Sequence, residues 1–162
     1  MNYKNSRILC SVGMRGDCST LVKESMLLAL ATDSNLHILH VVKSLSDDLL
    51  GTLRNNIHNP KRLTTLLAER THQWQEELEE LLEQFWVKNP EIKEKMKDRN
   101  VSISVEEGYP SAVICNYAEQ GNFNMITVAA NKQRYPAVYA GKVTKGVIKR
   151  AKVPVVVIPT TC

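Results

Sequence analysis

The feature that most constrains the fold of this chain is an alternation of short apolar runs with stretches of helical periodicity. A run such as VSISVEEG, residues 101–108, alternates apolar and polar residues, which is typical of a strand with one exposed face at a sheet edge. Other runs are nearly all apolar, as expected for strands buried on both faces: RILCSVG, LHILHVV, NMITVAA and VPVVVIP. Neighbouring parallel strands need crossover connections, so this order predicts a three-layer, open α/β domain with helices on both faces of a parallel sheet.

Local signals predict the helices that connect these strands. LVKESMLLALAT follows the first strand with apolar residues at helical spacing, after a loop in which Asp17 or Ser19 can cap the helix. Pro110 suits the first turn of a helix that Gly121 ends, and GKVTKGVIKRAK forms the last predicted helix.

The middle of the chain, residues 44–99, is an enlarged helical section. SDDLLGTLRNNI predicts a weak helix that Gly51 interrupts and that ends near Asn59 and Pro60. An amphipathic helix of about 25 residues follows, with one apolar stripe that favours packing on the core over binding a partner. The charged stretch EIKEKMKDRN is expected to be mostly solvated. The stripe contains Leu63, Leu66, Leu67, Trp74, Leu78, Leu81, Leu82 and Phe85.

Length and composition indicate a single domain over residues 1–162. No apolar run approaches the length of a membrane span, and the leading residues MNYKNSRILCSV lack the pattern of a signal peptide, so we expect a cytoplasmic protein. No metal site is expected, because the cysteines form no C-x-x-C pair and His37 and His40 would point to opposite faces of a strand. The thiols of a cytoplasmic protein are expected to stay reduced.

The C-terminal part of the chain is basic. Residues 121–162 contain seven Lys or Arg residues and no Asp or Glu. Such a charge can attract phosphate or nucleic acid, but no aromatic-interleaved motif accompanies it. A solvated helix face explains the charge better, and a nucleic-acid partner is not expected.

A ligand crevice is expected where the carboxyl ends of the strands meet, at the point where the strand order reverses. Val12, Gly13 and Met14 line it, together with residues 41–43 and 129–144. Phosphate cradles at this place are built from glycines, but the stretch AANKQRYPAVYAGKVTKG contains only Gly141 before its helix starts.

The phrases quoted above, together with VEEGYPSAVICNYAEQGNFNMITVAA and GKVTKGVIKRAKVPVVVIP, resemble the universal stress protein family from end to end, apart from the enlarged middle. The resemblance implies a five-stranded sheet with strand order 3-2-1-4-5 and a role in stress response or regulation rather than metabolism. Enzymatic activity is not expected. The resemblance also implies a homodimer that forms through the last strand. The residues expected in that strand are Val153, Val155, Val156, Val157 and Ile158.

Members of this family that bind ATP carry G-x2-G-x9-G-[S/T] after the fourth strand and an Asp at the end of the first. Here Ala129, Lys132 and Lys142 replace two glycines and the hydroxyl residue, Gly13 replaces the Asp, and one residue is missing before Gly141. The resemblance is therefore to members that do not bind ATP, and no cofactor is expected. The degenerate crevice consists of Gly13, Val42, Ala129, Lys132, Gly141, Lys142 and Thr144.

Three functions are compatible with these residues. The first is a homodimeric regulatory stress protein without nucleotide. The second is an ATP- or anion-sensing module in which lysines replace backbone donors and Thr144 lies at a helix start. The third is an interaction protein that binds a regulatory partner through the helical section. No set of nucleophile, base and orienting group is evident, and Cys18 is the only thiol expected to have a lowered pKa.

Overall fold

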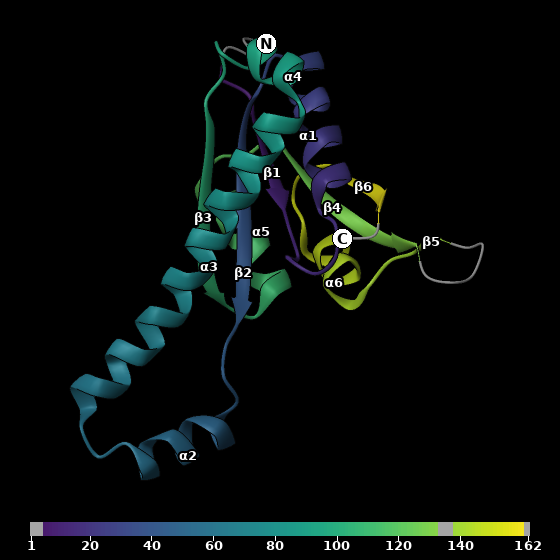
Figure 1. Ribbon diagram of the computed structural model, residues 1–162. Helices are drawn as coiled ribbons and strands as arrows, with labels where there is room; N and C mark the ends of the chain where they lie inside the picture. The colour runs from purple at the N-terminus through teal and green to yellow at the C-terminus, as the bar shows by residue number, and fades with distance from the viewer. Residues whose placement is uncertain (1–4, 133–137, 161–162) are drawn as a thin grey trace.

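The computed structural model describes residues 5–132 and 138–160, with the backbone alone for residues 131, 132, 138 and 139. Its sheet contains five parallel strands in the order β3-β2-β1-β4-β6 and a two-residue antiparallel strand, β5, paired with the end of β4 (Figure 1). The strands are β1 (Arg7–Ser11), β2 (Asn35–Lys43), β3 (Val101–Gly108), β4 (Met125–Lys132), β5 (Val138–Tyr139) and β6 (Val155–Thr160). The five strands expected from the sequence thus have the predicted order, with β6 as the fifth.

Helices cover both faces of the sheet and make two separate cores. Even-numbered residues of β1, such as Ile8 and Cys10, pack with α1, the second half of α3 and α4, whereas Leu9 packs with α5 and α6 on the opposite face. The helices are α1 (Ser19–Ala31), α2 (Asp47–Asn56), α3 (Pro60–Lys88), α4 (Pro90–Lys95), α5 (Pro110–Gln120) and α6 (Lys142–Arg150). In the described part of the chain, no helix is long and apolar enough to cross a membrane.

The helical section between β2 and β3 has the predicted helices with three differences. Gly51 lies inside α2 and does not interrupt it. The helix starts at a cap, Ser46, whose hydroxyl accepts a hydrogen bond from the amide of Leu49 at 3.3 Å. Helix α3 has 29 residues, since Asn59 caps it and Pro60 takes its first turn. The stretch expected to be solvated forms α4 and buries Ile92 and Met96 in the first core.

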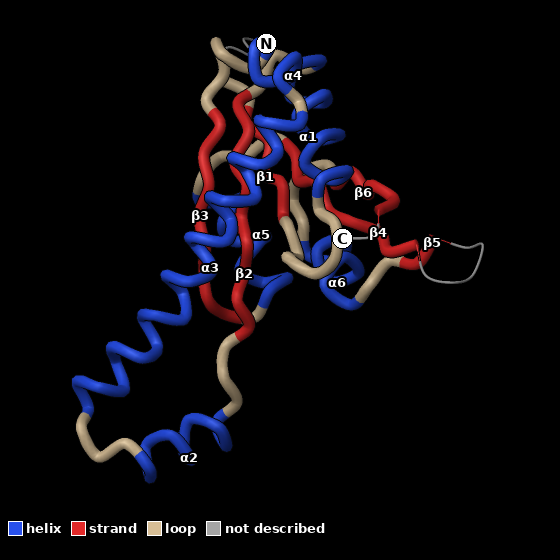
Figure 2. The backbone as a smooth tube through the Cα atoms, in the orientation of Figure 1, coloured by secondary structure: helices blue, strands red, loops and turns tan. Residues whose placement is uncertain are grey.

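The first half of this section projects away from the sheet as an arm of residues 44–69 (Figures 1 and 2). No residue between Lys43 and Glu77 is buried, and α2 contributes nothing to either core. Arg70 holds the base of the arm: its Nη2 donates to the carbonyl oxygen of Lys43 at 2.9 Å, and its Nη1 lies 3.9 Å from a carboxylate oxygen of Glu107. The predicted packing of the apolar stripe on the core is therefore correct only for the second half of α3.

Candidate functional site

The carboxyl edge of the parallel sheet carries the residues that were expected to form a crevice. Gly13 follows β1, Val42 lies near the end of β2, and Ala129 lies in the second half of β4. These strands are parallel neighbours, so the three residues lie toward the same edge of the sheet. The end of β1 is fixed to β2 by two hydrogen bonds: the amide of Val12 donates to Leu39 at 2.9 Å, and Nδ1 of His40 lies 2.9 Å from the carbonyl oxygen of Val12.

Ala129 and Thr144 are brought together by a hydrogen bond. The Thr144 hydroxyl donates to the Ala129 carbonyl oxygen at 2.7 Å, and the Thr144 side chain is buried. The hydroxyl that could have faced an anion therefore ties the first turn of α6 to β4. Gly141 is the N-cap of α6 and provides no side-chain acceptor, so the first amides of α6 are not capped by it, and exposed Lys142 follows directly.

Lys132 ends β4 in a hairpin, where the sequence had suggested a loop. Its backbone pairs with Val138, and Asn131 pairs with Tyr139 of β5 along one edge of β4 and with Thr160 of β6 along the other. Strands β1 and β6 pair with opposite sides of β4. Strand β5 therefore pairs with β4 on the same side as β1, beyond the point where β1 ends. The backbone between β4 and α6 thus begins as a strand pair next to the crevice, and residues 133–137 lie outside the described residues.

The two glycines of the predicted crevice do not need to be glycine. Neither has the positive φ that favours this residue, and a Cβ atom built on Gly13 or Gly141 meets no atom within 4 Å. An Asp at position 13 therefore fits the backbone. The left-handed conformations lie further along the same loop, at Met14 and Gly16, with φ of 57° and 70°.

A groove that was not predicted from the sequence lies beside this edge, on the face of the sheet covered by α1 and α3. It has a volume of about 580 Å³, within the range of small-molecule sites. It is lined by residues of the loop between β1 and α1, by the first residue of α1, and by the end of α3 with its C-cap Asn89. Leu81 and Phe85 line it together with Glu80 and Lys88, so its wall combines apolar surface with both charges. Of the two walls of this groove, only the loop with left-handed residues lies close to β1 in the sequence. The other wall belongs to α3, far along the chain, so the sequence does not show that the two walls meet.

His37 and His40 point to opposite faces of β2, as their spacing predicted. His40 lies against Trp74 of α3, with ring centroids 4.9 Å apart. Burial lowers the pKa of His37 to about 4, with a smaller contribution from the charge of Arg7. A neutral ring that is so weakly basic is poorly suited to general base catalysis near pH 7.

The surroundings of His37 form a closed network of hydroxyl groups. Nδ1 lies 2.6 Å from the Ser102 hydroxyl, and Nε2 lies 2.7 Å from that of Ser104 and 3.0 Å from that of Tyr117. The Tyr117 ring also stacks on the imidazole. Both ring nitrogens therefore have partners, and the network ties β2, β3 and α5 together.

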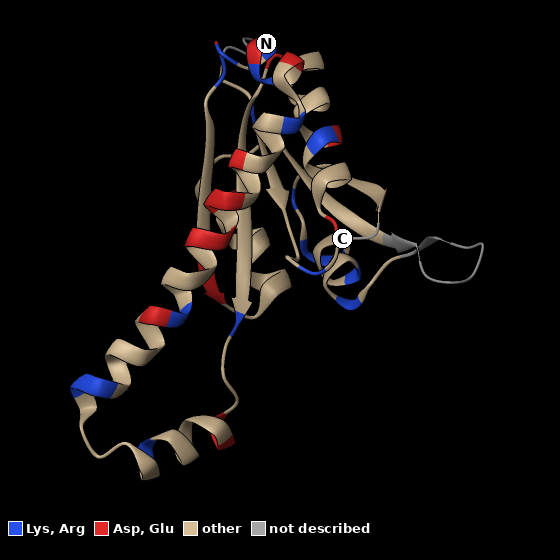
Figure 3. Cartoon of the chain, viewed as in Figure 1, with Lys and Arg blue, Asp and Glu red and all other residues tan. Residues whose placement is uncertain are grey.

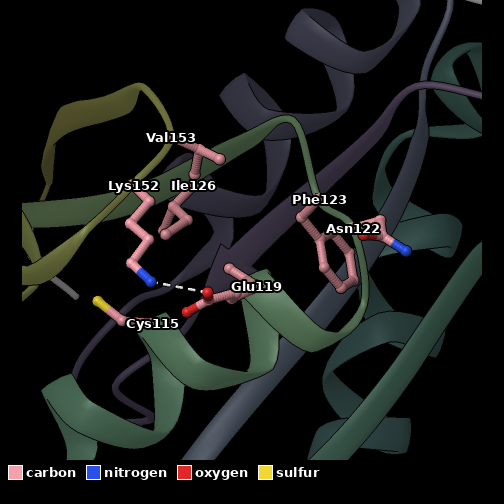
Figure 4. Close-up of a pocket in the computed structure, with 8 residues that line it drawn as sticks. Cys115, Glu119, Asn122, Phe123, Ile126, Lys152 and Val153 are labelled. Carbon is pink, nitrogen blue, oxygen red and sulfur yellow. Dashed lines mark hydrogen bonds and ion pairs between the residues drawn. The ribbon is translucent and has the colours of Figure 1, made fainter.

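A small pocket of about 190 Å³ lies between α5, the start of β4 and the turn before β6 (Figure 4). Lys152 Nζ and Glu119 Oε1 form an ion pair 2.7 Å long beside the pocket, so each charge is already neutralised by the other. Burial raises the pKa of the Cys115 thiol, although the charge of Arg150 opposes this, and the thiol is a weak nucleophile at neutral pH. The pocket therefore offers little for covalent chemistry.

The remaining candidate groups have structural roles. Cys18 has 2% of its surface exposed and takes part in a disulfide, so the expectations that it is a thiol with a lowered pKa and that all thiols are reduced were wrong. Asp17 accepts a hydrogen bond from the amide of Ser19 at 2.9 Å, but the N-cap of α1 is Cys18 and not Asp17 or Ser19 as predicted. Within residues 5–132 and 138–160, no cluster of three or more His, Cys, Asp or Glu side chains could hold a metal ion.

Comparison with known proteins agrees with this architecture. The sequence model of the universal stress protein family matches residues 4–159, nearly the whole chain. The chain belongs to the universal stress protein family. No curated protein matches its sequence.

Solved structures of other universal stress proteins share the fold. The protein UspA from Lactobacillus plantarum is 22% identical, with a TM-score of 0.68 over 94% of this chain and 97% of that one. A universal stress protein in complex with cAMP is 15% identical, with a TM-score of 0.56 over 96% and 97%. One from Archaeoglobus fulgidus in complex with dAMP is 14% identical, with a TM-score of 0.55 over 94% and 97%.

Proposed function

We propose that this protein is a homodimeric regulatory member of the universal stress protein family that does not bind ATP at the carboxyl edge of its sheet. The observation that carries this proposal is the hydrogen bond from Thr144 to Ala129. Because the Thr144 hydroxyl, the one hydroxyl group of the degenerate crevice, donates to the protein backbone, it is not available to a phosphate group. The pairing of Lys132 with Val138 supports it, since backbone groups at the second motif position serve the sheet. The weak base His37 and the weak nucleophile Cys115 support a role without catalysis.

Steric exclusion and charge attraction act in opposite directions at this edge. Replacing glycine by lysine adds a side chain where the family motif lets the backbone approach phosphates. An exposed lysine attracts a phosphate group by only about 1 kcal/mol or less, and salt weakens this attraction further. We therefore expect exclusion to dominate.

A nucleotide- or anion-sensing function is the alternative. Solved neighbours bind cAMP and dAMP in their complexes, and the N-terminus of α6 carries Lys142 without a side-chain cap from Gly141. Backbone amides at a helix start together with a lysine can hold an anion. In this alternative, Lys142 replaces the hydroxyl group of the glycine motif.

Titration calorimetry of the full chain with Mg-ATP, AMP and cAMP distinguishes the two functions. We expect no saturable heat up to low millimolar nucleotide. A stoichiometric isotherm in the micromolar range that weakens in Lys142→Ala would overturn the proposal and establish the lysine-dependent sensor. Lys149→Ala is the matched control, because this exposed lysine lies in the last turn of the same helix.

The proposed homodimer forms through β6. This strand pairs with β4 alone among the described strands, and the sequence has no charged residue from Val153 to Cys162 to protect its free edge. Two copies related by a two-fold axis can continue the sheet by pairing β6 with itself. Val155, Val156, Val157 and Ile158 lie in the strand, whereas Val153 precedes it.

A charge placed on the exposed side of β6 tests the dimer. Val156 packs on the first core, so Val157, with 36% of its surface exposed, is the cleaner position. We expect Val157→Lys to raise the monomer fraction in sedimentation velocity. Val87→Lys, at a position with 81% of its surface exposed on α3, should leave it unchanged. A Val157→Lys protein that remains fully dimeric would show that β6 is not the interface.

A further inference from the structure

The arm of residues 44–69 is a folded element without a core of its own. Helix α2 has ten residues and none is buried, although isolated helices of this length are marginal in water. Its apolar side consists of Leu49, Leu50 and Leu53, which fall at the spacing of one helix face, and Ile57 follows at the C-cap. Leu49 has 45% of its surface exposed, and Leu66 at the start of α3 has 42%. Leu50, Leu53 and Ile57 are half-buried, so the apolar face of the arm is only partly covered by the rest of the chain.

The charges of the arm are also unpartnered within the chain. Among the described residues, no ion pair engages Asp47, Asp48 or Arg54, or the basic residues Lys61 and Arg62 at the start of α3. Figure 3 shows their separation: acidic residues lie at the start of α2, and basic residues lie toward its end and at the start of α3. The start of α2 is therefore negatively charged and its end is positively charged, so the two ends are complementary in charge.

This separation has a geometric consequence for two copies of the helix. Asp47 and Arg54 are seven positions apart in α2, close to two turns, so both lie on the same flank of the apolar face. When two identical helices pack antiparallel about a two-fold axis, the same flank of each meets the other. Asp47 of one copy then lies opposite Arg54 of its partner, and the reciprocal pair forms at the same time.

From this self-complementarity we propose that the arm is a self-association surface, whose occupant is the arm of a second copy of this chain packed antiparallel on α2. The apolar residues supply the attraction, and the two reciprocal ion pairs set the orientation and register. The arm and β6 lie on opposite sides of the molecule (Figure 1), so both contacts can form at once. This inference is independent of the strand dimer, and the two together would join dimers into larger assemblies.

The size of the arm limits the strength of this contact. A helix of ten residues is about 15 Å long and about 10 Å wide, so one of its faces supplies well under the roughly 800 Å² that each partner gives to a stable interface. The self-association should therefore depend on protein concentration and respond strongly to a single change on the apolar face, because a two-fold contact places each residue in the interface twice.

Sedimentation velocity of the full chain over a range of concentrations tests the apolar part of the proposal. We expect Leu49→Glu to raise the dissociation constant of the arm contact by about tenfold or more. Asn55→Glu is the matched control, because Asn55 is an exposed residue of the same helix on the side opposite the apolar face. Circular dichroism of both variants checks that α2 remains folded.

A charge exchange tests the antiparallel orientation. Asp47→Arg alone and Arg54→Asp alone should each weaken the contact, since each places like charges opposite one another. The double variant should recover association, because the pairs then form with the charges reversed. A contact with a different protein or with an anionic surface would not recover in this way.

The outcomes separate this proposal from the strand dimer. If the largest assembly disappears in Leu49→Glu and a dimer remains that Val157→Lys dissociates, both contacts exist. Equal association of Leu49→Glu and Asn55→Glu overturns the arm contact and leaves the strand dimer unaffected. Failure of the double exchange to restore association overturns the antiparallel pairing on α2.

Discussion

The two halves of α3 carry the same apolar pattern in very different surroundings. In the second half, Leu78 and Phe85 have 0% and 3% of their surfaces exposed and belong to the first core. In the first half, Leu66 has 42% exposed and no residue is buried. A periodic apolar stripe therefore predicts an amphipathic helix, but not that the core of the chain covers the whole of its apolar face.

Length explains where the difference begins. With 29 residues α3 is about 43 Å long, whereas β2 with nine residues spans about 30 Å. The excess of about 13 Å corresponds to roughly nine helical residues, which must extend past the carboxyl end of the sheet. Arg70 contacts Lys43 and Glu107 close to this point, and the arm starts beyond it.

The largest difference between the two halves should appear when one leucine is truncated in each. Leu78→Ala removes a fully buried side chain and leaves a cavity, so the free energy of unfolding should fall by about 2–5 kcal/mol. Leu66→Ala, on the same helix, should change it by about 0.5 kcal/mol or less. Urea denaturation measures both. Similar losses in the two variants would show that the arm is part of the cooperative core.

Most of the fold could be predicted because burial on both faces of the sheet leaves a clear record in the sequence. The residues of β2 from Leu36 to Val42 are all buried, and they form a continuous run with two histidines. Those two histidines, His37 and His40, were correctly placed on opposite faces from their spacing alone. Strand order then follows from the crossover rule and the family resemblance.

The site could be predicted only in position. The carboxyl edge follows from the parallel order, but the direction of the Thr144 hydroxyl toward Ala129 depends on how α6 docks on β4. The short strand β5 has two residues, too few for any periodic signal. The groove beside the loop between β1 and α1 depends on the tertiary position of α3, which no local pattern encodes.

The buried histidine His37 in the core should make the free energy of unfolding depend on pH. His37 has a pKa of about 4 in the folded protein, below the ordinary value of about 6.5 in the unfolded chain. The unfolded state therefore binds the proton first, and stability is lost as the pH falls from about 6.5 toward 4, by up to about 1.4 kcal/mol per pH unit.

Denaturation of His37→Gln and His58→Gln over this pH range isolates the effect. The stability difference between wild type and His37→Gln should shrink as the pH is lowered, because the variant lacks this titration. His40 also has a pKa lowered by burial, but it is present in both proteins and cancels in the difference. His58→Gln, at an exposed position on the arm, is the control for the change of residue type. A constant difference for His37→Gln would contradict the assignment.

Removing a threonine hydroxyl from the core should lower the free energy of unfolding more than removing a threonine hydroxyl from the arm. The Thr127 hydroxyl lies 2.7 Å from that of Ser25 under α1, where both are fully buried, whereas the Thr65 hydroxyl donates to the exposed carbonyl oxygen of Lys61. Thr127→Val leaves the Ser25 hydroxyl poorly satisfied and should cost about 1–2 kcal/mol. Thr65→Val should stay within about 0.5 kcal/mol in the same denaturation assay.

The smallest effect on global stability should come from the cap of α2. Ser46→Ala removes the acceptor for the Leu49 amide and weakens the helix by about 1 kcal/mol. Because α2 buries no residue, this loss should not change the midpoint of global unfolding. It should instead raise hydrogen exchange of the α2 amides by about fivefold at low protein concentration, where few arms are paired.

Ser46→Asp is the control for this change, because a carboxylate also accepts the Leu49 amide and suits a helix start. Exchange from α2 in Ser46→Asp should therefore match the wild type. If Ser46→Ala lowers the unfolding midpoint as well, the arm and the core unfold as one unit despite the absence of buried residues in α2. Protection of the α2 amides against exchange should also rise with protein concentration in the wild type, and less so in Leu49→Glu. This result would mean that a second copy buries the apolar face of the arm, as the sheet buries that of the second half of α3.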